Sequence, residues 1–346
     1  MSKTKKVAVG LSGGVDSGTT AMILQEEGYE VIGVTMRISD HQDKEIESAK
    51  YVANTLGIEH HIVDFRNEFN NIVVKYFKET YELGKTPNPC IKCNKSFKYG
   101  RLMDFCKTIG ADYFATGHYA RKVYDSETNT YRILKAINSR KDQSYNLFQL
   151  TQKELEYLIF PIGEFASKEH VRKKSSEKLN IVSSKSDSTG ICFIEHKKVG
   201  RYLKEVCSSS VIEGNFVDNQ GNILGKHKGI AYYTIGQKRK LGEDLSFNYV
   251  VTKIDSEKNT VVLGSEENLI VNKLILENTN FLSPNVTLPL DVDIKVSQWS
   301  EVYKGKIYTE GDAIAIEFYD PVRAPAPGQA AVFYIGDELV GGGFIS

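Results

Sequence analysis

The chain has 346 residues, enough for two or three domains, and its 41% hydrophobic and 25% charged residues are typical of an ordinary globular protein. Its 44 basic and 44 acidic residues cancel, which excludes a general attraction to nucleic acids or membranes and leaves only local contacts with a polyanion. No stretch is apolar enough for a membrane span or a signal peptide. We therefore expect a cytoplasmic protein that makes no membrane contact.

The first half alternates strand-like and helix-like segments, which predicts a parallel sheet with crossover helices. Strands are predicted at residues 6–12, 29–37 and 59–65, and residues 111–121 are predicted to form a fourth strand that runs into a turn. Helices are predicted at residues 18–27 and 43–58, along the stripe Phe69, Val73, Phe77 and Thr80, and at residues 168–181 behind an N-cap at Ser167. Thr151 and Glu154 form a capping box that begins a further short helix.

Beyond about residue 205 the pattern changes to short β-rich runs separated by turns rich in Gly and Asn. Residues 248–265 are typical of a hairpin, and the last part of the chain is typical of a small antiparallel barrel. We therefore predict an α/β fold in three parts. They are a parallel-sheet catalytic domain at 1–205, a small central β-rich domain at 206–270 and a C-terminal β-barrel at 271–346.

The stretch "GLSGGVDS", residues 10–17, joins the first strand to the first helix. Its glycines let backbone N–H groups close around an anion, and the helix N-terminus adds partial positive charge. Ser12, Ser17 and Thr19 offer hydroxyl donors, while Asp16 is placed to cap the helix or to help position Mg²⁺. No Lys-Ser/Thr pair follows the second glycine, so this is not a Walker A loop. Glycines alone would fit a plain turn, but the full motif favours a nucleotide site.

An odd, sparse set of five cysteines argues against a disulfide framework: Cys90, Cys93, Cys106, Cys192 and Cys207. The first two form a C-x-x-C in a basic loop, where Lys92 and Lys95 are expected to lower the thiol pKa values. A structural zinc site would need four ligands, and no second ligand pair stands nearby. Two readings remain: inert buried thiols, which fit Cys106 and Cys207, and a reactive set drawn from the other three.

The loop "SGGVDS" resembles that of the ATP pyrophosphatases, which split ATP into AMP and pyrophosphate to adenylate a carbonyl oxygen. Further motifs narrow the resemblance to the tRNA-uridine 2-sulfurtransferases, the bacterial tRNA 2-thiouridylases of the MnmA family. They are "GLSGGVDS", "TPNPC-x-x-CNK", "ATGHYAR", "KDQSYNLF", "KSDSTGICFI", "GKHKGIAYYTIGQKRKLG" and "APGQAAVFYIGDELVGGG". The resemblance spans almost the whole chain and implies the same three-part fold.

This resemblance implies ATP- and Mg²⁺-dependent adenylation of the 2-keto oxygen of a tRNA wobble uridine, followed by sulfur transfer and release of AMP and pyrophosphate. Cys93 matches the catalytic nucleophile, and Cys192 matches the cysteine that carries a persulfide received from a donor protein. The two cysteines would end the reaction as a disulfide. ATP would be bound by Gly10, Leu11, Ser12, Gly13, Gly14, Val15, Asp16, Ser17, Met36 and Gly117. The tRNA or its target base would be contacted by Asn88, Pro89, Cys90, His118, Lys141, Asp142, Gln143 and Gln329.

Some of these residues have plainer explanations. His118 also fits a hydrogen-bonded histidine at a strand end, and Lys141-Asp142 fits a solvated turn. The basic run 226–240 fits either a solvated face or a surface that contacts the phosphate backbone of tRNA. A second basic candidate is the run 172–174.

The chain departs from the family pattern in three places. Many members have aspartate where this chain has Cys90, so Cys90, Cys93 and Cys192 together offer three thiolates, enough to hold an iron–sulfur cluster that would replace the persulfide. The longer insert that often follows the second strand is missing. The segment "KVSQWS", residues 295–300, is a poor match to an expected basic segment, which weakens the expectation of a tRNA contact at Lys295.

Two other functions compete with tRNA thiolation. A different ATP-pyrophosphatase-type synthetase, such as an amidating enzyme, would need an ammonia source, and the sequence contains no glutaminase domain. A non-catalytic protein that binds tRNA or a nucleotide would need no thiolate. The presence of both the loop motif and the cysteines therefore favours the thiolating enzyme.

Overall fold

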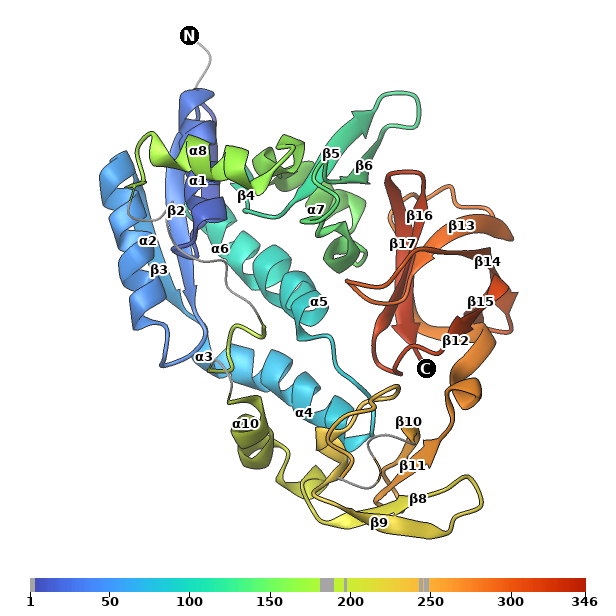
Figure 1. The fold of residues 1–346 in the computed structure, drawn as a ribbon. Helices are drawn as coiled ribbons and strands as arrows, with labels where there is room; N and C mark the ends of the chain where they lie inside the picture. Colours follow the sequence, from blue (N-terminus) through green and yellow to red (C-terminus); the bar gives the residue numbers. More distant parts are fainter. Residues whose placement is uncertain (1–3, 181–189, 196–197, 243–244, 246–248) are drawn as a thin grey trace.

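The computed structural model describes residues 4–180, 190–195, 198–242, 245 and 249–346. It contains a parallel sheet at one side, a barrel at the other and a small four-stranded sheet beside both (Figure 1). The parallel sheet has the order β3-β2-β1-β4-β7. Its strands are β1 (Lys6–Gly10), β2 (Glu30–Arg37), β3 (Glu59–Asp64), β4 (Tyr113–Ala115) and β7 (Leu158–Ile159). Every pairing in it is parallel, as the alternating pattern predicts.

Alternating side chains bury both faces of the parallel sheet. On β1, Val7 and Val9 join the cluster under α1 (Val15–Glu26), α2 (Asp43–Leu56) and α8 (Lys168–Ser176). Ala8 points the other way, into the cluster that holds the C-x-x-C helix and α6 (Met103–Thr108). A strand with period-two alternation and apolar residues on both faces is typical of a central parallel strand.

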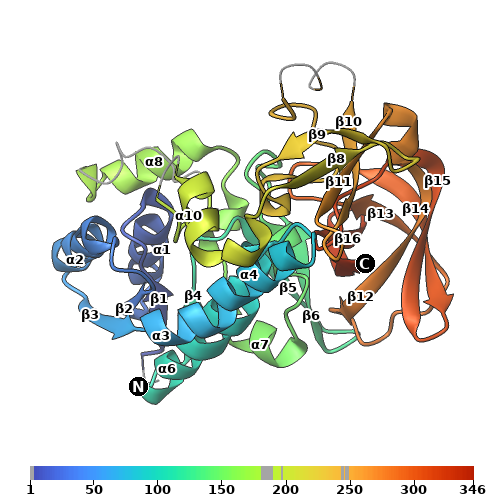
Figure 2. The same ribbon diagram turned by 90° about the horizontal axis from the view of Figure 1, so that it is seen from below.

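One long helical segment crosses from the sheet toward the other parts of the molecule. It comprises α3 (Arg66–Phe69), a π-helical turn over Asn70–Val74 and α4 (Lys75–Glu82), which together carry the predicted stripe of Phe69, Val73 and Phe77. Helix α10 (Val199–Val206) lies along α4 in both ribbon views (Figures 1 and 2), and the Phe77 and Tyr202 rings lie 6.1 Å apart.

Most of the remaining strands build a small mixed sheet, which contains one parallel pairing, and a closed antiparallel barrel. The small sheet has the order β10-β11-β8-β9, and β10 and β11 form the predicted hairpin. Its strands are β8 (Gly214–Val217), β9 (Ile223–His227), β10 (Val250–Asp255) and β11 (Thr260–Gly264). The barrel closes because β12 pairs with both β15 and β17. Its strands are β12 (Ile270–Phe281), β13 (Leu290–Lys295), β14 (Tyr303–Glu310), β15 (Ala313–Arg323), β16 (Ala330–Ile335) and β17 (Glu338–Ile345). The predicted fold class is thereby confirmed.

The predicted fourth strand is β4, and the chain leaves the sheet in the predicted turn. After β4 the chain turns through Thr116–Tyr119 and continues as β5 (Ala120–Asp125), which forms a hairpin with β6 (Thr130–Lys135). That hairpin joins the barrel wall, because Ile133 and Leu134 pair with β17. The sheet strand ends where Gly117 meets the start of α1, since a Cβ on Gly117 would lie 2.8 Å from the Ser17 amide nitrogen.

Candidate active site

The loop between β1 and α1 contains most of the residues predicted to bind ATP. Gly13 has a φ of 71°, and a Cβ there would lie 2.4 Å from the Glu45 carbonyl oxygen, so only glycine fits. The Ser17 hydroxyl accepts a bond from the Ser12 N–H at 3.1 Å and donates to the Gly14 carbonyl at 3.2 Å. No side chain caps α1 at Gly14, which leaves N–H groups of its first turn available to an anion.

The residues predicted to bind ATP lie at the carboxyl edge of the parallel sheet. Gly10 ends β1, Met36 stands one residue before the end of β2, and Gly117 follows β4. These ends lie side by side because β1 pairs with both β2 and β4. Open parallel sheets bind nucleotides at this edge, which is where the predicted ATP residues lie.

Asp16 has partners that the sequence analysis did not identify. The Tyr119 hydroxyl donates to Asp16 Oδ1 at 2.7 Å, and Lys168 Nζ donates to Oδ1 at 2.6 Å and to Oδ2 at 2.7 Å. The expected helix cap at Asp16 is therefore wrong. Lys168 occupies both carboxylate oxygens in this structure, so Asp16 could ligate Mg²⁺ only after Lys168 has moved away.

The C-x-x-C lies on α5 (Pro89–Cys93), directly before a π-helical stretch over Asn94–Leu102. Cys93 is buried and packs in the cluster that also contains Phe193 and Ile194, whereas Cys90 and Cys192 are exposed. The charges of Cys90 and Cys192 both act on the Cys93 thiol, so the fold brings the three predicted cysteines together. All five cysteines are free thiols, and residues 185–189 of the motif around Cys192 lie outside the described residues.

The three thiols are not activated as the sequence analysis expected. Burial raises the pKa of Cys93 to about 12. Cys90 and Cys192 keep part of their surface exposed, but the protein atoms around each thiol still remove enough water to raise its pKa above the usual value. The cation that opposes this effect at all three is Lys98. Lys95 is instead paired with Glu154 at 2.9 Å.

Lys92 likewise lies elsewhere, over the Tyr76 ring at 5.9 Å. The expectation that Lys92 and Lys95 lower the thiol pKa values is therefore wrong.

Lys98 is anchored by a buried polar cluster. Its Nζ lies 3.4 Å from His118 Nε2, while His118 Nδ1 lies 2.8 Å from Thr116 Oγ1 and 2.9 Å from the Tyr99 hydroxyl. Burial and the neighbouring Lys98 hold the pKa of His118 well below its usual value, so the ring is neutral. Because an ammonium only donates, His118 Nε2 accepts from Lys98 and Nδ1 carries the proton. His118 is only 8% exposed, and in this arrangement it positions Lys98 rather than facing solvent.

The buried thiol makes stability depend on pH. The folded protein keeps the Cys93 proton up to about pH 12, whereas an unfolded thiol with the ordinary pKa of 9.0 loses it earlier. Its contribution to stability is therefore complete below pH 9.0 and disappears as the pH rises toward about 12. We expect the difference in free energy of unfolding between wild type and Cys93→Ala to shrink by up to about 4 kcal/mol across that window. Urea unfolding at a series of pH values measures it, and a constant difference would contradict the burial argument.

The segment at residues 86–88, just before the C-x-x-C, is held by hydrogen bonds to Gln329 and to Thr234. Gln329 Nε2 donates to the Thr86 and Pro87 carbonyls at 3.2 and 3.1 Å, and the Thr86 hydroxyl donates to that of Thr234 at 3.4 Å. Asn88 caps α5, since its Oδ1 accepts from the Ile91 N–H at 3.3 Å. The predicted tRNA residue Gln329 therefore holds the backbone of the two residues that directly precede the predicted target-base residues.

Two of the three residues at 141–143 are built into the fold. Asp142 is buried and accepts bonds from the Ala136 N–H, the Ser144 N–H and the Ser144 hydroxyl. The Gln143 side chain accepts from the Tyr119 N–H at 3.0 Å, which ties this turn to the residue that contacts Asp16.

Beside this turn lies a cavity of about 250 Å³. It is lined by Ser139, Arg140, Asp142, Lys295, Gln298, Trp299 and Ser300. Trp299, the one tryptophan of the chain, is 79% exposed there. The exposed indole of Trp299 lies beside Arg140 and Lys295. The sequence did not predict this arrangement, because residues 295–300 match the family pattern poorly.

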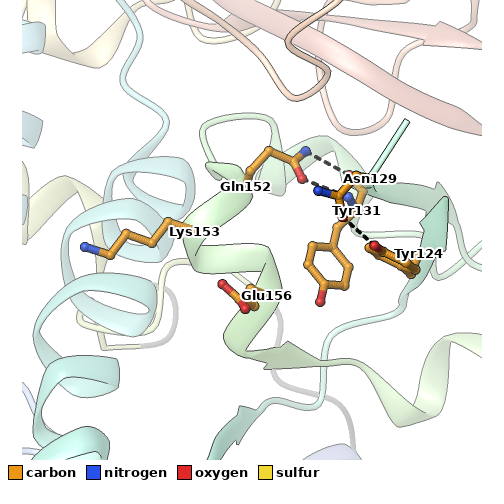
Figure 3. A pocket seen from close by; sticks show the side chains of 6 residues that line it. All are labelled: Tyr124, Asn129, Tyr131, Gln152, Lys153 and Glu156. Carbon is orange, nitrogen blue, oxygen red and sulfur yellow. Dashed lines mark hydrogen bonds between the residues drawn. The ribbon is translucent and has the colours of Figure 1, made fainter. Parts of the chain in front are cut away.

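A second cavity, of about 380 Å³, lies between the β5–β6 hairpin and α7 (Gln152–Tyr157) (Figure 3). Gln152 reaches from α7 to the Tyr131 backbone, where it accepts from the N–H at 2.7 Å and donates to the carbonyl at 2.9 Å. The Tyr124 hydroxyl donates to Asn129 in the same way within the hairpin. The lining of this cavity includes none of the predicted site residues. Its polar groups bond to one another and to the backbone, and so stabilise the hairpin and its contact with α7.

In the described part of the chain, no group of three or more His, Cys, Asp or Glu side chains is arranged to hold a metal ion. The three thiols in their present positions thus do not fit a cluster site. Over the same residues, no helix has both the length and the apolar character needed to cross a membrane.

Comparison with known proteins gives matches along the whole chain. Residues 5–196 match the tRNA methyl transferase HUP domain family, 200–265 its PRC-barrel domain and 271–345 the aminomethyltransferase β-barrel domain. The tRNA-specific 2-thiouridylase MnmA of Acetivibrio thermocellus is 42% identical, with all of both chains covered. The protein of that name from Clostridium acetobutylicum is also 42% identical, over 99% of each chain.

Among solved structures, the U34-tRNA thiolase NcsA from Methanococcus maripaludis with its 4Fe–4S cluster matches 59% of this chain and 68% of that chain. Its 19% identity and TM-score of 0.37 carry no argument about the chemistry of the present site.

Proposed function

This chain belongs to the MnmA family of tRNA-specific 2-thiouridylases, and we propose that it converts the wobble uridine of tRNA to 2-thiouridine by adenylation and persulfide transfer. It is accordingly a sulfurtransferase that modifies tRNA and uses ATP. The observation that carries the proposed mechanism is the convergence of Cys93 and Cys192 beside Lys98, although the two cysteines are far apart in the sequence.

The first step activates the uracil ring. The uracil O2 attacks the α-phosphorus of ATP, and the bond from that phosphorus to the bridging oxygen breaks so that pyrophosphate leaves with the electron pair. The N–H groups of the loop and of the first turn of α1 are placed to stabilise the charge on the departing pyrophosphate. The arrangement at Asp16 gives no support for a Mg²⁺ ligand there, so no step is assigned to the ion.

The second step uses two cysteines in different environments. A persulfide on Cys192 attacks C2 of the adenylated ring with its terminal sulfur, and AMP leaves with O2. The Cys93 thiolate then attacks Sγ of Cys192, so that the S–S bond breaks and its electron pair stays with the transferred sulfur as 2-thiouridine. The product disulfide between Cys93 and Cys192 is reopened by a thiol reductant.

The exposure of the two cysteines supports this division of roles. Cys192 is exposed, as a thiol that receives sulfur from a persulfide-carrying protein must be, and Cys93 is buried, as suits a thiol that acts only inside the complex. Cys90 is exposed close to both. In this mechanism it borders the target base and carries no sulfur.

The cavity beside residues 138–143 supports contact with tRNA. Arg140 and Lys295 supply charge for a phosphate, and Trp299 supplies an exposed ring on which an unpaired base can stack. We expect Trp299→Ala to weaken tRNA binding by roughly 10-fold, since one base–aromatic stack contributes about 1–3 kcal/mol. Gel-shift titration measures this change, with Trp299→Phe as the control that keeps a ring. Equal affinity of Trp299→Ala and wild type would contradict a stacking role.

The direct test of the proposed function is product stoichiometry. Purified protein is incubated with ATP, an unmodified tRNA transcript, a persulfide-loaded donor protein and a thiol reductant that reopens the disulfide, and AMP, pyrophosphate and 2-thiouridine are quantified. Thiolation predicts one of each per turnover and none without ATP. An amidating synthetase would form AMP only with ammonia, and a binding protein would form no AMP; either result would overturn the proposal.

A further inference from the structure

Lys168 connects the start of α8 to the predicted phosphate loop. It is the first residue of α8, and its side chain is only 13% exposed. Its Nζ donates to both carboxylate oxygens of Asp16 and lies 5.6 Å from the centre of the Tyr119 ring. Helix α8 packs across α1 (Figure 1), so this ammonium lies at the N-terminal end of α1, where the loop N–H groups gather.

A purely structural role for this ion pair is poorly motivated. The same two helices are already joined at their other ends, where Lys174 Nζ lies 2.8 Å from Glu26 and 2.7 Å from Glu177. The Lys168–Asp16 pair therefore adds a largely buried ammonium to two helices that are already connected elsewhere. Lys168 differs from Lys174 in its burial and in its place beside an anion-binding loop.

We propose that Lys168 is a ligand of the β- and γ-phosphates of ATP and that Asp16 holds it in place until ATP binds. This inference rests on the proposed function. The polyphosphate carries more negative charge than one carboxylate, so it competes with Asp16 for the ammonium, and only a short side-chain movement is needed. When the bond between the α-phosphorus and the bridging oxygen breaks, the charge that develops on the departing pyrophosphate lies next to Lys168.

Calorimetric binding of ATP, pyrophosphate and AMP to the full chain tests this role. For Lys168→Met we expect roughly a 10- to 100-fold loss of affinity for ATP and pyrophosphate, the loss of one charge-assisted hydrogen bond. AMP, which lacks both phosphates, is expected to bind within about twofold of wild type; this also shows that the variant is folded. Lys168→Arg should recover part of the loss.

The matched control is Lys174→Met, which breaks the other ion pair between α8 and α1 and should leave all three affinities unchanged. Unchanged affinity of Lys168→Met for ATP and pyrophosphate would overturn the inference, as would an equal loss in Lys174→Met. The result is separable from the proposed function, because a wild type that binds ATP but forms no 2-thiouridine would contradict that function and leave the Lys168 measurement valid.

Discussion

Replacing Cys93 or Cys192 with serine is expected to abolish 2-thiouridine formation, with a loss of at least roughly a thousandfold. Cys192→Ser removes the sulfur that carries the persulfide. Cys93→Ser removes the nucleophile that releases the transferred sulfur, and a hydroxyl cannot form the disulfide that balances the reaction. Mass spectrometry of nucleosides from digested tRNA measures the product.

Adenylation should survive both substitutions, because the ATP loop and Asp16 lie on other elements. We expect AMP to form in both variants while 2-thiouridine does not. The matched control is Cys106→Ser, a buried thiol on α6 outside the cysteine trio, which should retain thiolation. Retention of more than about a tenth of the wild-type rate by either variant would show that its thiol is not required.

The second large effect is expected at Lys98, where Lys98→Met should slow both thiolation and alkylation of the cysteines. Lys98 lowers the pKa of all three thiols against the effect of burial, so its loss raises those pKa values further and reduces the thiolate fraction at any pH below them. Each pKa unit costs about tenfold in rate under those conditions. We expect the pH profile of iodoacetamide reaction to move to higher pH.

A neighbouring lysine provides the control for this experiment. Lys95 lies on the same π-helical stretch but is paired with Glu154 on α7, so Lys95→Met should leave the alkylation profile unchanged. Lys98→Arg should restore the profile partly, because it keeps the charge. An identical alkylation profile in Lys98→Met and wild type would contradict the claim that Lys98 lowers the pKa values of the three thiols.

The features that the sequence predicted correctly are those set by local pattern. The glycine loop, strand β1 before it and helix α1 after it depend on neighbours within a few residues, and all three were predicted. The hairpin of β10 and β11 also follows from its own turn. The cysteine trio was found by resemblance of motifs, since spacing alone says nothing about contacts between Cys93 and Cys192.

The features that were missed depend on irregular or distant geometry. Lys98 stands five residues after Cys93, and a π-helical stretch, which closes a turn over five residues, brings it toward the thiols where an α-helix would not. Lys168 reaches Asp16 across 152 positions of sequence. The β5–β6 hairpin extends from the sheet domain and pairs with β17 of the barrel. Nothing in the sequences of β6 and β17 indicates that these two strands pair.

The proposed mechanism depends most on sulfur being carried by Cys192 itself. The measurement that tests this most directly is anaerobic purification, followed by mass spectrometry of the Cys192 peptide after loading by a persulfide donor and by iron and acid-labile sulfide analysis of the same sample. We predict an added sulfur on Cys192, its loss when tRNA and ATP are supplied, and no iron. Stoichiometric iron and sulfide that disappear in Cys90→Ala would instead show a cluster held by the cysteine trio and would contradict the persulfide mechanism.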